Sequence, residues 1–151
     1  MTARIVKFAT IRDPSGNLTA FERDAVGFDI ARTFILHDVV EGASRGGHAH
    51  RVLQELIVAV SGSFAVTTWD EHGAHQWHLN RASEGLLVPP MVWRKLSDFS
   101  GNAVALVLAS TPYDPSDYLR DFEEFQALLP ETEPDYFSKR AKDLDLYRGL
   151  K

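Results

Sequence analysis

The stretch GASRGGHAHRVLQELIVAVSG, residues 42–62, decides the fold class because a glycine-rich turn leads directly into alternating apolar residues. His48 and His50 are two residues apart, so on a strand they project to the same face. Four residues separate His50 from Glu55, and six separate Glu55 from Gly62. The spacing alone leaves three interpretations open: a metal site, an acid–base pair, or a histidine-rich loop.

The flanking sequence predicts strands from Arg4 to about Leu108. Short apolar or alternating segments recur there, namely RIVKF, NLTAFE, FDIARTFIL, QELIVAV, SFAVTTW, HQWHL, GLLVP and AVALVLA. Turn-forming residues separate them, such as DPSG at 13–16 and DEHG at 70–73. About eight closely spaced strands with no helix between them indicate an all-β fold, a small antiparallel barrel of jelly-roll type.

A helix is expected after the strands. Asp114 is a suitable N-cap, and Pro115 and Asp117 suit the first turn of a helix. The amphipathic stretch that follows predicts a helix over 115–129, which Pro130 ends. We expect this helix to cover the sheet.

At 151 residues the chain suits one domain, residues 1–129, and we expect 130–151 to form a C-terminal extension with a short helix or a partly ordered tail. The absence of cysteine excludes disulfides, thiolate zinc sites and a cysteine nucleophile. A net charge of −5 without a block of Lys and Arg argues against nucleic acid and anionic membranes as partners. No apolar run approaches the roughly 18 residues that span a bilayer, and the start of the chain lacks a secretory signal, so we expect a cytoplasmic protein.

The spacing of the opening stretch resembles the first sequence motif of the cupins, which are small jelly-roll barrels. In metal-binding cupins a second motif, similar to Pro-x-Gly-x-x-His, supplies a further histidine ligand. The corresponding stretch here is PPMVWR, residues 89–94, with Met91 in place of the glycine and Arg94 in place of the histidine. A guanidinium stays charged and repels a divalent cation. The sequence therefore favours an ion pair between Arg94 and Glu55 across the lumen over a metal site.

Six longer landmarks follow in chain order: DPSGNLTAFE (13–22), RGGHAH (45–50), SGSFAV (61–66), EGLLVPPMVW (84–93), DFSGNAVALVLAS (98–110) and YDPSDYLRDFEEF (113–125). Together they resemble the sugar 3,4-ketoisomerases, cupins that act on dTDP-4-keto-6-deoxyglucose. The likeness extends from about residue 5 to residue 128.

This resemblance implies an isomerase without metal or redox cofactor, which moves the ketone of a dTDP-linked sugar from C4 to C3 through an enediol in deoxyamino-sugar biosynthesis. His48 and His50 correspond to the family's catalytic pair, with His50 favoured as the base. Near neutral pH a neutral imidazole can accept a proton while a charged partner donates one. Arg45 corresponds to an arginine that would stabilise the enediolate or hold a phosphate. The resemblance also implies a homodimer that exchanges the N-terminal strand RIVKFATI, residues 4–11.

Four further residues are candidate substrate contacts: Glu55, Trp93, Arg94 and Tyr113. Trp93 can stack on a base or sugar, although a tryptophan at a strand end more often packs in a core. Tyr113 is a candidate substrate contact or a hydrophobic staple for the predicted helix.

Glu55 and Arg94 depart from the family, which usually has glutamine and histidine at these positions, and RTFIL (32–36) lacks the tyrosine that is common in that strand. These departures leave two alternatives. One is a non-catalytic sugar-nucleotide-binding cupin. The other is a metal-dependent cupin that uses His48, His50 and Glu55 as a two-histidine, one-carboxylate ligand set.

Overall fold

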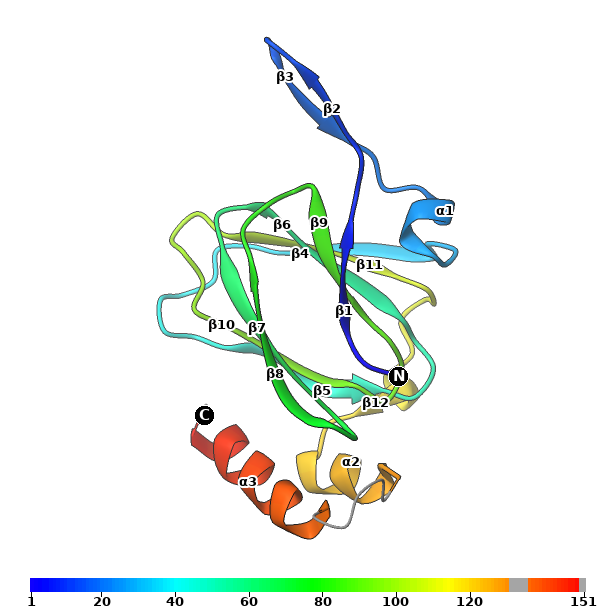
Figure 1. Ribbon diagram of the computed structural model, residues 1–151, viewed down its shortest axis with the longest axis vertical. Coiled ribbons are helices and arrows are strands. Elements are labelled where there is room, and N and C mark those ends of the chain that lie inside the picture. The colour runs from blue at the N-terminus through cyan, green and yellow to red at the C-terminus, as the bar shows by residue number, and fades with distance from the viewer. Residues whose placement is uncertain (131–135, 150–151) are drawn as a thin grey trace.

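Two five-stranded antiparallel sheets face each other in the computed structural model, which describes residues 1–130 and 136–149 (Figure 1). One sheet has the order β1 (Arg4–Lys7), β9 (Glu84–Val88), β6 (Glu55–Ser61), β11 (Val104–Ala109) and β4 (Arg32–Leu36). The other has the order β12 (Tyr118–Leu119), β5 (Arg45–His50), β10 (Trp93–Ser97), β7 (Phe64–Asp70) and β8 (Gly73–Leu79). The predicted all-β jelly-roll class is confirmed.

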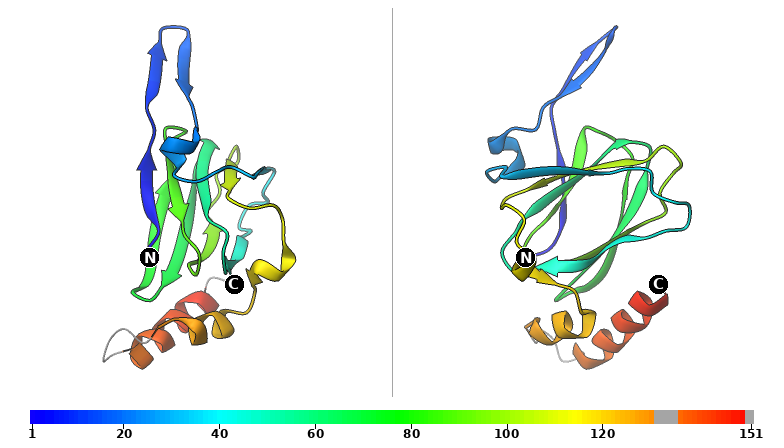
Figure 2. Two further views of the ribbon diagram at one scale, coloured as in Figure 1. Left: turned by 90° about the vertical axis from the view of Figure 1, so that its right-hand side faces the viewer. Right: turned by 180° about the vertical axis from the view of Figure 1, so that it is seen from behind.

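The N-terminal segment extends beyond the sheets. After β1, which pairs with β9, the hairpin of β2 (Thr10–Asp13) and β3 (Gly16–Thr19) projects away from the rest of the chain, and the short helix α1 (Arg23–Val26) follows it (Figures 1 and 2). Ile11 and Leu18 face each other across the hairpin and are 67% and 56% exposed. The hairpin therefore presents apolar side chains to solvent.

The core between the sheets follows from strand alternation, because successive side chains of a strand point to opposite faces. On β6, Ile57 and Ala59 belong to the cluster between the sheets. Leu56 and Val58 point the other way and pack in a second cluster with Val26 of α1. β6 is thus buried on both faces, which explains its continuous apolar sequence.

The predicted helix over 115–129 is wrong in its first half. The chain forms a 3₁₀ turn, η1 (Pro115–Asp117), then β12, and only then the helix α2 (Phe122–Leu128). Tyr118 and Leu119 are extended because they pair with β5 and complete the edge of its sheet. Asp121 accepts a hydrogen bond from the backbone N–H of Glu124 at 2.7 Å and caps α2 in place of the predicted cap.

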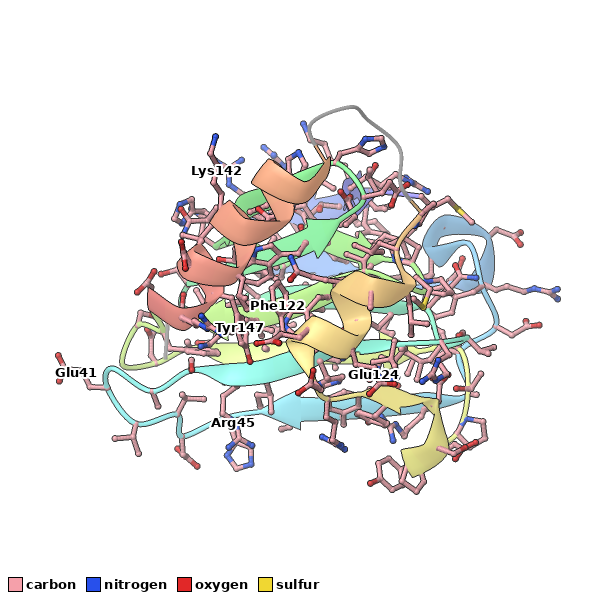
Figure 3. All side chains as sticks on the ribbon, turned by 90° about the horizontal axis from the view of Figure 1, so that it is seen from below. Glu41, Arg45, Phe122, Glu124, Lys142 and Tyr147 are labelled. Carbon is pink, nitrogen blue, oxygen red and sulfur yellow. The ribbon has the colours of Figure 1, made fainter. Side chains whose placement is uncertain are left out.

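The helix α3 (Tyr136–Gly149) packs with α2 against the outer face of the sheet that contains β5 and β10 (Figures 2 and 3). The ring of Tyr147 stacks on that of Phe122 with 4.3 Å between centroids, and it contacts Trp93 at 5.7 Å. The expected tail, 130–151, thus contains a helix of 14 residues, and residues 131–135 and 150–151 lie outside the described part of the chain. Among the described helices, none has the length and apolar character needed to cross a membrane.

Candidate active site

A cavity of about 470 Å³ lies between the two sheets. Strands β4, β5, β6, β10 and β11 contribute to its wall, as does the segment 113–120. Five of the predicted site residues line it, namely Arg45, His48, Glu55, Arg94 and Tyr113. The structure therefore brings most of the predicted site together in one place.

Two glycines shape strand β5 just before His48. Gly46 and Gly47 have φ values of 81° and 78°, a region that favours glycine. Arg94 pairs with His48 and Lys95 pairs with Gly46, so Gly47 is the extra residue of a bulge. A Cβ atom on Gly46 would lie 3.3 Å from the carbonyl oxygen of Arg94. The glycines thus allow β5 to approach β10 closely at the point where the first histidine enters the cavity wall.

His50 lies behind this wall, and both nitrogens of its ring are held. Nδ1 is 3.0 Å from Oδ2 of Asp117, and Nε2 is 3.1 Å from a terminal nitrogen of Arg94. An arginine only donates and a carboxylate accepts, so Nδ1 carries the hydrogen and Nε2 carries the lone pair. Asp117 is fixed in turn by the backbone N–H groups of Val52 and Leu53, at 2.8 and 3.2 Å.

The two imidazoles are in contact, and both are neutral near pH 7. Burial and the charge of Arg94 lower the pKa of His50 to about 4, against the carboxylates of Glu55 and Asp117, which raise it. Burial also lowers the pKa of His48 to about 2, with further effects from Arg94 and His50. These shifts favour the neutral form of both histidines, whereas the sequence led us to expect one neutral and one charged member.

His48 differs from His50 in its access to the cavity. It lines the cavity, and its Nε2 atom is buried with no hydrogen-bond partner in residues 1–130 and 136–149. The two rings meet edge to face with 4.9 Å between centroids. One imidazole thus lines the cavity and has a buried nitrogen without a partner in the described residues, and the other is held by Asp117 and Arg94 in a fixed tautomer.

The predicted ion pair between Arg94 and Glu55 is confirmed. A terminal nitrogen of Arg94 donates to Oε2 of Glu55 at 2.9 Å, and the Nε atom contacts Oε1. The other terminal nitrogen donates to the carbonyl of His48 at 2.8 Å. Arg94 is 4% exposed and Glu55 is 2% exposed, so this is a buried ion pair.

The same geometry opposes the metal-dependent alternative. The guanidinium of Arg94 bonds to both His50 and Glu55, two of the three suggested ligands, and its charge would repel a cation placed among them. No group of three histidine or acidic side chains within the described ranges is arranged to hold a metal ion. The residues present therefore do not fit a divalent metal.

Three arginines give the cavity a basic lining: Arg32, Arg45 and Arg120. None of them forms an ion pair with another residue in the described part of the chain. Arg32 lies 5.3 Å from the ring centroid of Tyr113, and Arg120 lies 4.3 Å from that of Tyr118. Such unpaired guanidinium groups suit an anionic ligand.

Trp93 does not reach the cavity. It is fully buried on the opposite face of β10, where its ring packs at 5.1 Å from Phe122 of α2. Conversely, sequence reasoning missed Arg32, Tyr118 and Arg120 as cavity residues, and it placed Asp117 in the first turn of a helix. For the last three of these, the sequence signal that could have pointed to them is the family landmark YDPSDYLR (113–120). In the structure this segment pairs with the edge of β5.

Two facing antiparallel sheets around a cavity with a histidine pair and a buried arginine define a cupin-like protein. The rmlC epimerase of Mycobacterium tuberculosis shares this fold, with a TM-score of 0.65 and 16% identity over 77% of this chain and 66% of the epimerase. That likeness concerns the fold alone.

The chain belongs to the family described as FdtA, WxcM-like, C-terminal, which it matches over residues 1–129. It is 35% identical over 130 residues to a TDP-4-oxo-6-deoxy-alpha-D-glucose-3,4-oxoisomerase from Aneurinibacillus thermoaerophilus. The matched region covers 85% of this chain and 94% of that relative. The sugar 3,4-ketoisomerase QdtA from Thermoanaerobacterium thermosaccharolyticum, solved with TDP, has a TM-score of 0.80 and 34% identity over 82% of this chain and 91% of its own. WlaRA, a TDP-fucose-3,4-ketoisomerase from Campylobacter jejuni, has a TM-score of 0.82 and 30% identity over 86% of this chain and 97% of its own.

Proposed function

We propose that this protein is a sugar-nucleotide 3,4-ketoisomerase that moves the ketone of dTDP-4-keto-6-deoxyglucose from C4 to C3 without a metal. The observation that carries the proposal is the pair of neutral imidazoles at a cavity lined by three unpaired arginines. The relative from A. thermoaerophilus, named as an oxoisomerase of this sugar, supports the substrate class. The structure of QdtA with TDP supports dTDP as the nucleotide.

His50 acts as the base in this proposal. Its Nε2 carries the lone pair, and Asp117 at Nδ1 stabilises the imidazolium that forms when the proton at C3 is removed. In the structure this lone pair accepts a hydrogen bond from Arg94 behind the cavity wall, so substrate binding has to break that bond and open a path between C3 and this nitrogen. Glu55 then keeps the guanidinium paired. The proton returns to C4 of the enediol from His50 directly or through His48, whose ring is in contact with it.

The basic cavity lining accounts for binding of a diphosphate. The whole chain has a net charge of −5, so the three arginines form a local positive site in an acidic protein. Arg45 begins strand β5 just before its bulge, and Arg32 and Arg120 line the same cavity from other parts of the chain. Tyr113, 59% exposed, is available to a nucleotide base or sugar ring.

The protein would act as a homodimer in the cytoplasm, in the synthesis of deoxyamino sugars for surface glycans. The hairpin of β2 and β3 supports the dimer, because it projects from its own sheets (Figure 2). It also exposes the side chains of Ile11 and Leu18. A second copy would bury this surface. Light scattering is expected to give the mass of two chains, and Ile11→Glu with Leu18→Glu is expected to shift it to one. Exchange of residues 4–11 between the copies stays a prediction.

The activity is tested with dTDP-4-keto-6-deoxyglucose in D₂O after treatment of the protein with a chelator. We expect nuclear magnetic resonance to show the 3-keto isomer with deuterium in the ring, and His50→Asn to slow its formation by about 10²- to 10⁴-fold. Thermal stabilisation by dTDP without any turnover would instead identify a binding protein. Activity that is lost with the chelator and restored by a metal ion would identify the metal-dependent alternative.

A further inference from the structure

We propose that the hydroxyl of Tyr118 is a catalytic group of this reaction and carries the oxygen-bound proton between O4 and O3 of the sugar. The inference rests on the proposed function and extends it. Moving a ketone from C4 to C3 transfers two protons, one between the carbons and one between the oxygens. The histidine pair accounts for the first of these transfers only.

The proton balance defines what the second group must do. As the C3–H bond breaks and the imidazole takes that proton, the C4=O4 π electrons take a proton from the phenol, which gives the enediol and a phenolate. The phenolate then removes the proton of the O3 hydroxyl while the C3=O3 bond forms, and the imidazolium returns its proton to C4. Both the phenol and the imidazole regain their starting states, so no oxidant, reductant or other reactant is needed.

The fold places Tyr118 beside the imidazole pair. In the antiparallel pairing of β12 with β5, Tyr118 lies directly opposite His50, and side chains of directly opposed residues lie on the same face. Its ring centroid is 4.3 Å from that of His50 and 4.7 Å from that of His48. It also lines the cavity, so its ring borders both the imidazole pair and the substrate space.

The other groups of the cavity wall are less suited to this step. The described lining contains two further hydroxyls, on Ser44 and Tyr113. Tyr113 is 59% exposed and its ring lies 5.8 Å from Tyr118, on the side of Arg32. A serine hydroxyl is a far weaker acid than a phenol, whose ordinary pKa is about 10. Phe34 supplies a ring from β4 without a hydroxyl.

Arg120 provides the electrostatic support that a transient phenolate requires. Its guanidinium carbon lies 4.3 Å from the ring centroid of Tyr118, and it has no ion-pair partner in the described part of the chain. A cation in this position stabilises negative charge as it develops on the ring oxygen. Asp117, Tyr118 and Arg120 therefore form one short segment that serves both proton transfers.

The test is Tyr118→Phe, which removes the hydroxyl and keeps the ring that packs on the imidazoles. We expect kcat to fall by about 10²-fold or more while KM changes by less than about threefold. Binding of dTDP, measured by calorimetry, is expected to stay at the wild-type level. The matched control is Tyr147→Phe, which removes a phenol outside the cavity and is expected to leave kcat unchanged.

A Tyr118→Phe variant whose kcat stays within about threefold of wild type would overturn the inference. Loss of dTDP binding together with activity would also overturn it, because the hydroxyl would then act in binding. If the wild-type protein itself lacks isomerase activity, the proposed function fails instead. If the phenylalanine variant shows no thermal transition, the fallback is 3,5-difluorotyrosine at position 118, whose phenol is more acidic than that of tyrosine. The alkaline limb of the kcat–pH profile should then shift to lower pH, and an unshifted limb would overturn the inference.

Discussion

The buried pair of Arg94 and Glu55 offers a quantitative test of the cavity electrostatics. Glu55→Gln leaves a guanidinium that is 4% exposed without its carboxylate. Removing one partner of a buried pair costs about 3 to 5 kcal/mol, and the glutamine oxygen can still accept one N–H, so we expect the free energy of unfolding to fall by about 3 kcal/mol. Arg94→His leaves the carboxylate of Glu55 unpaired and is expected to cost a similar amount near neutral pH.

The double variant, Glu55→Gln with Arg94→His, removes both charges together. We expect its free energy of unfolding to lie within about 1 kcal/mol of wild type, which corresponds to a coupling of several kcal/mol. Urea denaturation of the four proteins measures this coupling. Neutralising the exposed pair of Arg51 and Glu124, with 3.2 Å between nitrogen and oxygen, is the control and is expected to cost less than about 1 kcal/mol. Single variants at the buried pair that cost no more than this control, or additive losses in the double variant, would refute the reasoning.

Three further predictions follow from the same contacts. The pKa values of about 4 for His50 and about 2 for His48 lie below the unfolded value of 6.5, so the unfolded chain binds more protons below pH 6.5, and the free energy of unfolding should be largest above pH 6.5 and decrease toward pH 4. Urea denaturation at a series of pH values measures this free energy, and a value that stays constant from pH 7 to pH 4.5 would contradict the prediction. Asp117→Asn is expected to lower kcat by about 10²-fold, because the imidazolium of His50 loses its anionic partner, while dTDP binding is retained. Steady-state kinetics measure kcat and calorimetry measures dTDP binding. An unchanged kcat would count against the role of Asp117. Tyr147→Ala removes a partly exposed ring stacked on Phe122 and is expected to cost about 2 kcal/mol of stability with kcat little changed. Wild-type stability in urea would contradict a stabilising role for this stacked pair.

Local sequence patterns predicted the strands, whereas the inward direction of the site residues was inferred from the likeness to the cupin motif. The two-residue period of a strand places His48 on a defined face, and the opposite charges of Arg94 and Glu55 at two cupin ligand positions predicted their pairing. The same period also excludes Trp93 from the cavity, because adjacent residues on β10 point to opposite faces and Arg94 points inward. The prediction for Trp93 could therefore have been corrected from the sequence.

The contributions of Asp117 and Tyr118 could not be predicted in the same way. They reach His50 through the pairing of β12 with β5, between residues far apart in the chain. Locally, DPSD is typical of a helix start, and the turn η1 does begin there, but strand pairing then overrides helix propensity. The charge state of the histidines was also beyond sequence reasoning, because burial in the folded cavity determines it.

The most direct test of the account is solvent deuterium exchange on dTDP-4-keto-6-deoxyglucose, compared between wild type and His50→Asn after removal of metal ions. The account predicts that wild type forms the 3-keto isomer and introduces deuterium into the ring, and that the variant binds dTDP but does neither at a comparable rate. Deuterium exchange at the wild-type rate in His50→Asn would contradict the account. So would a wild-type protein that binds dTDP but catalyses no exchange on the sugar substrate.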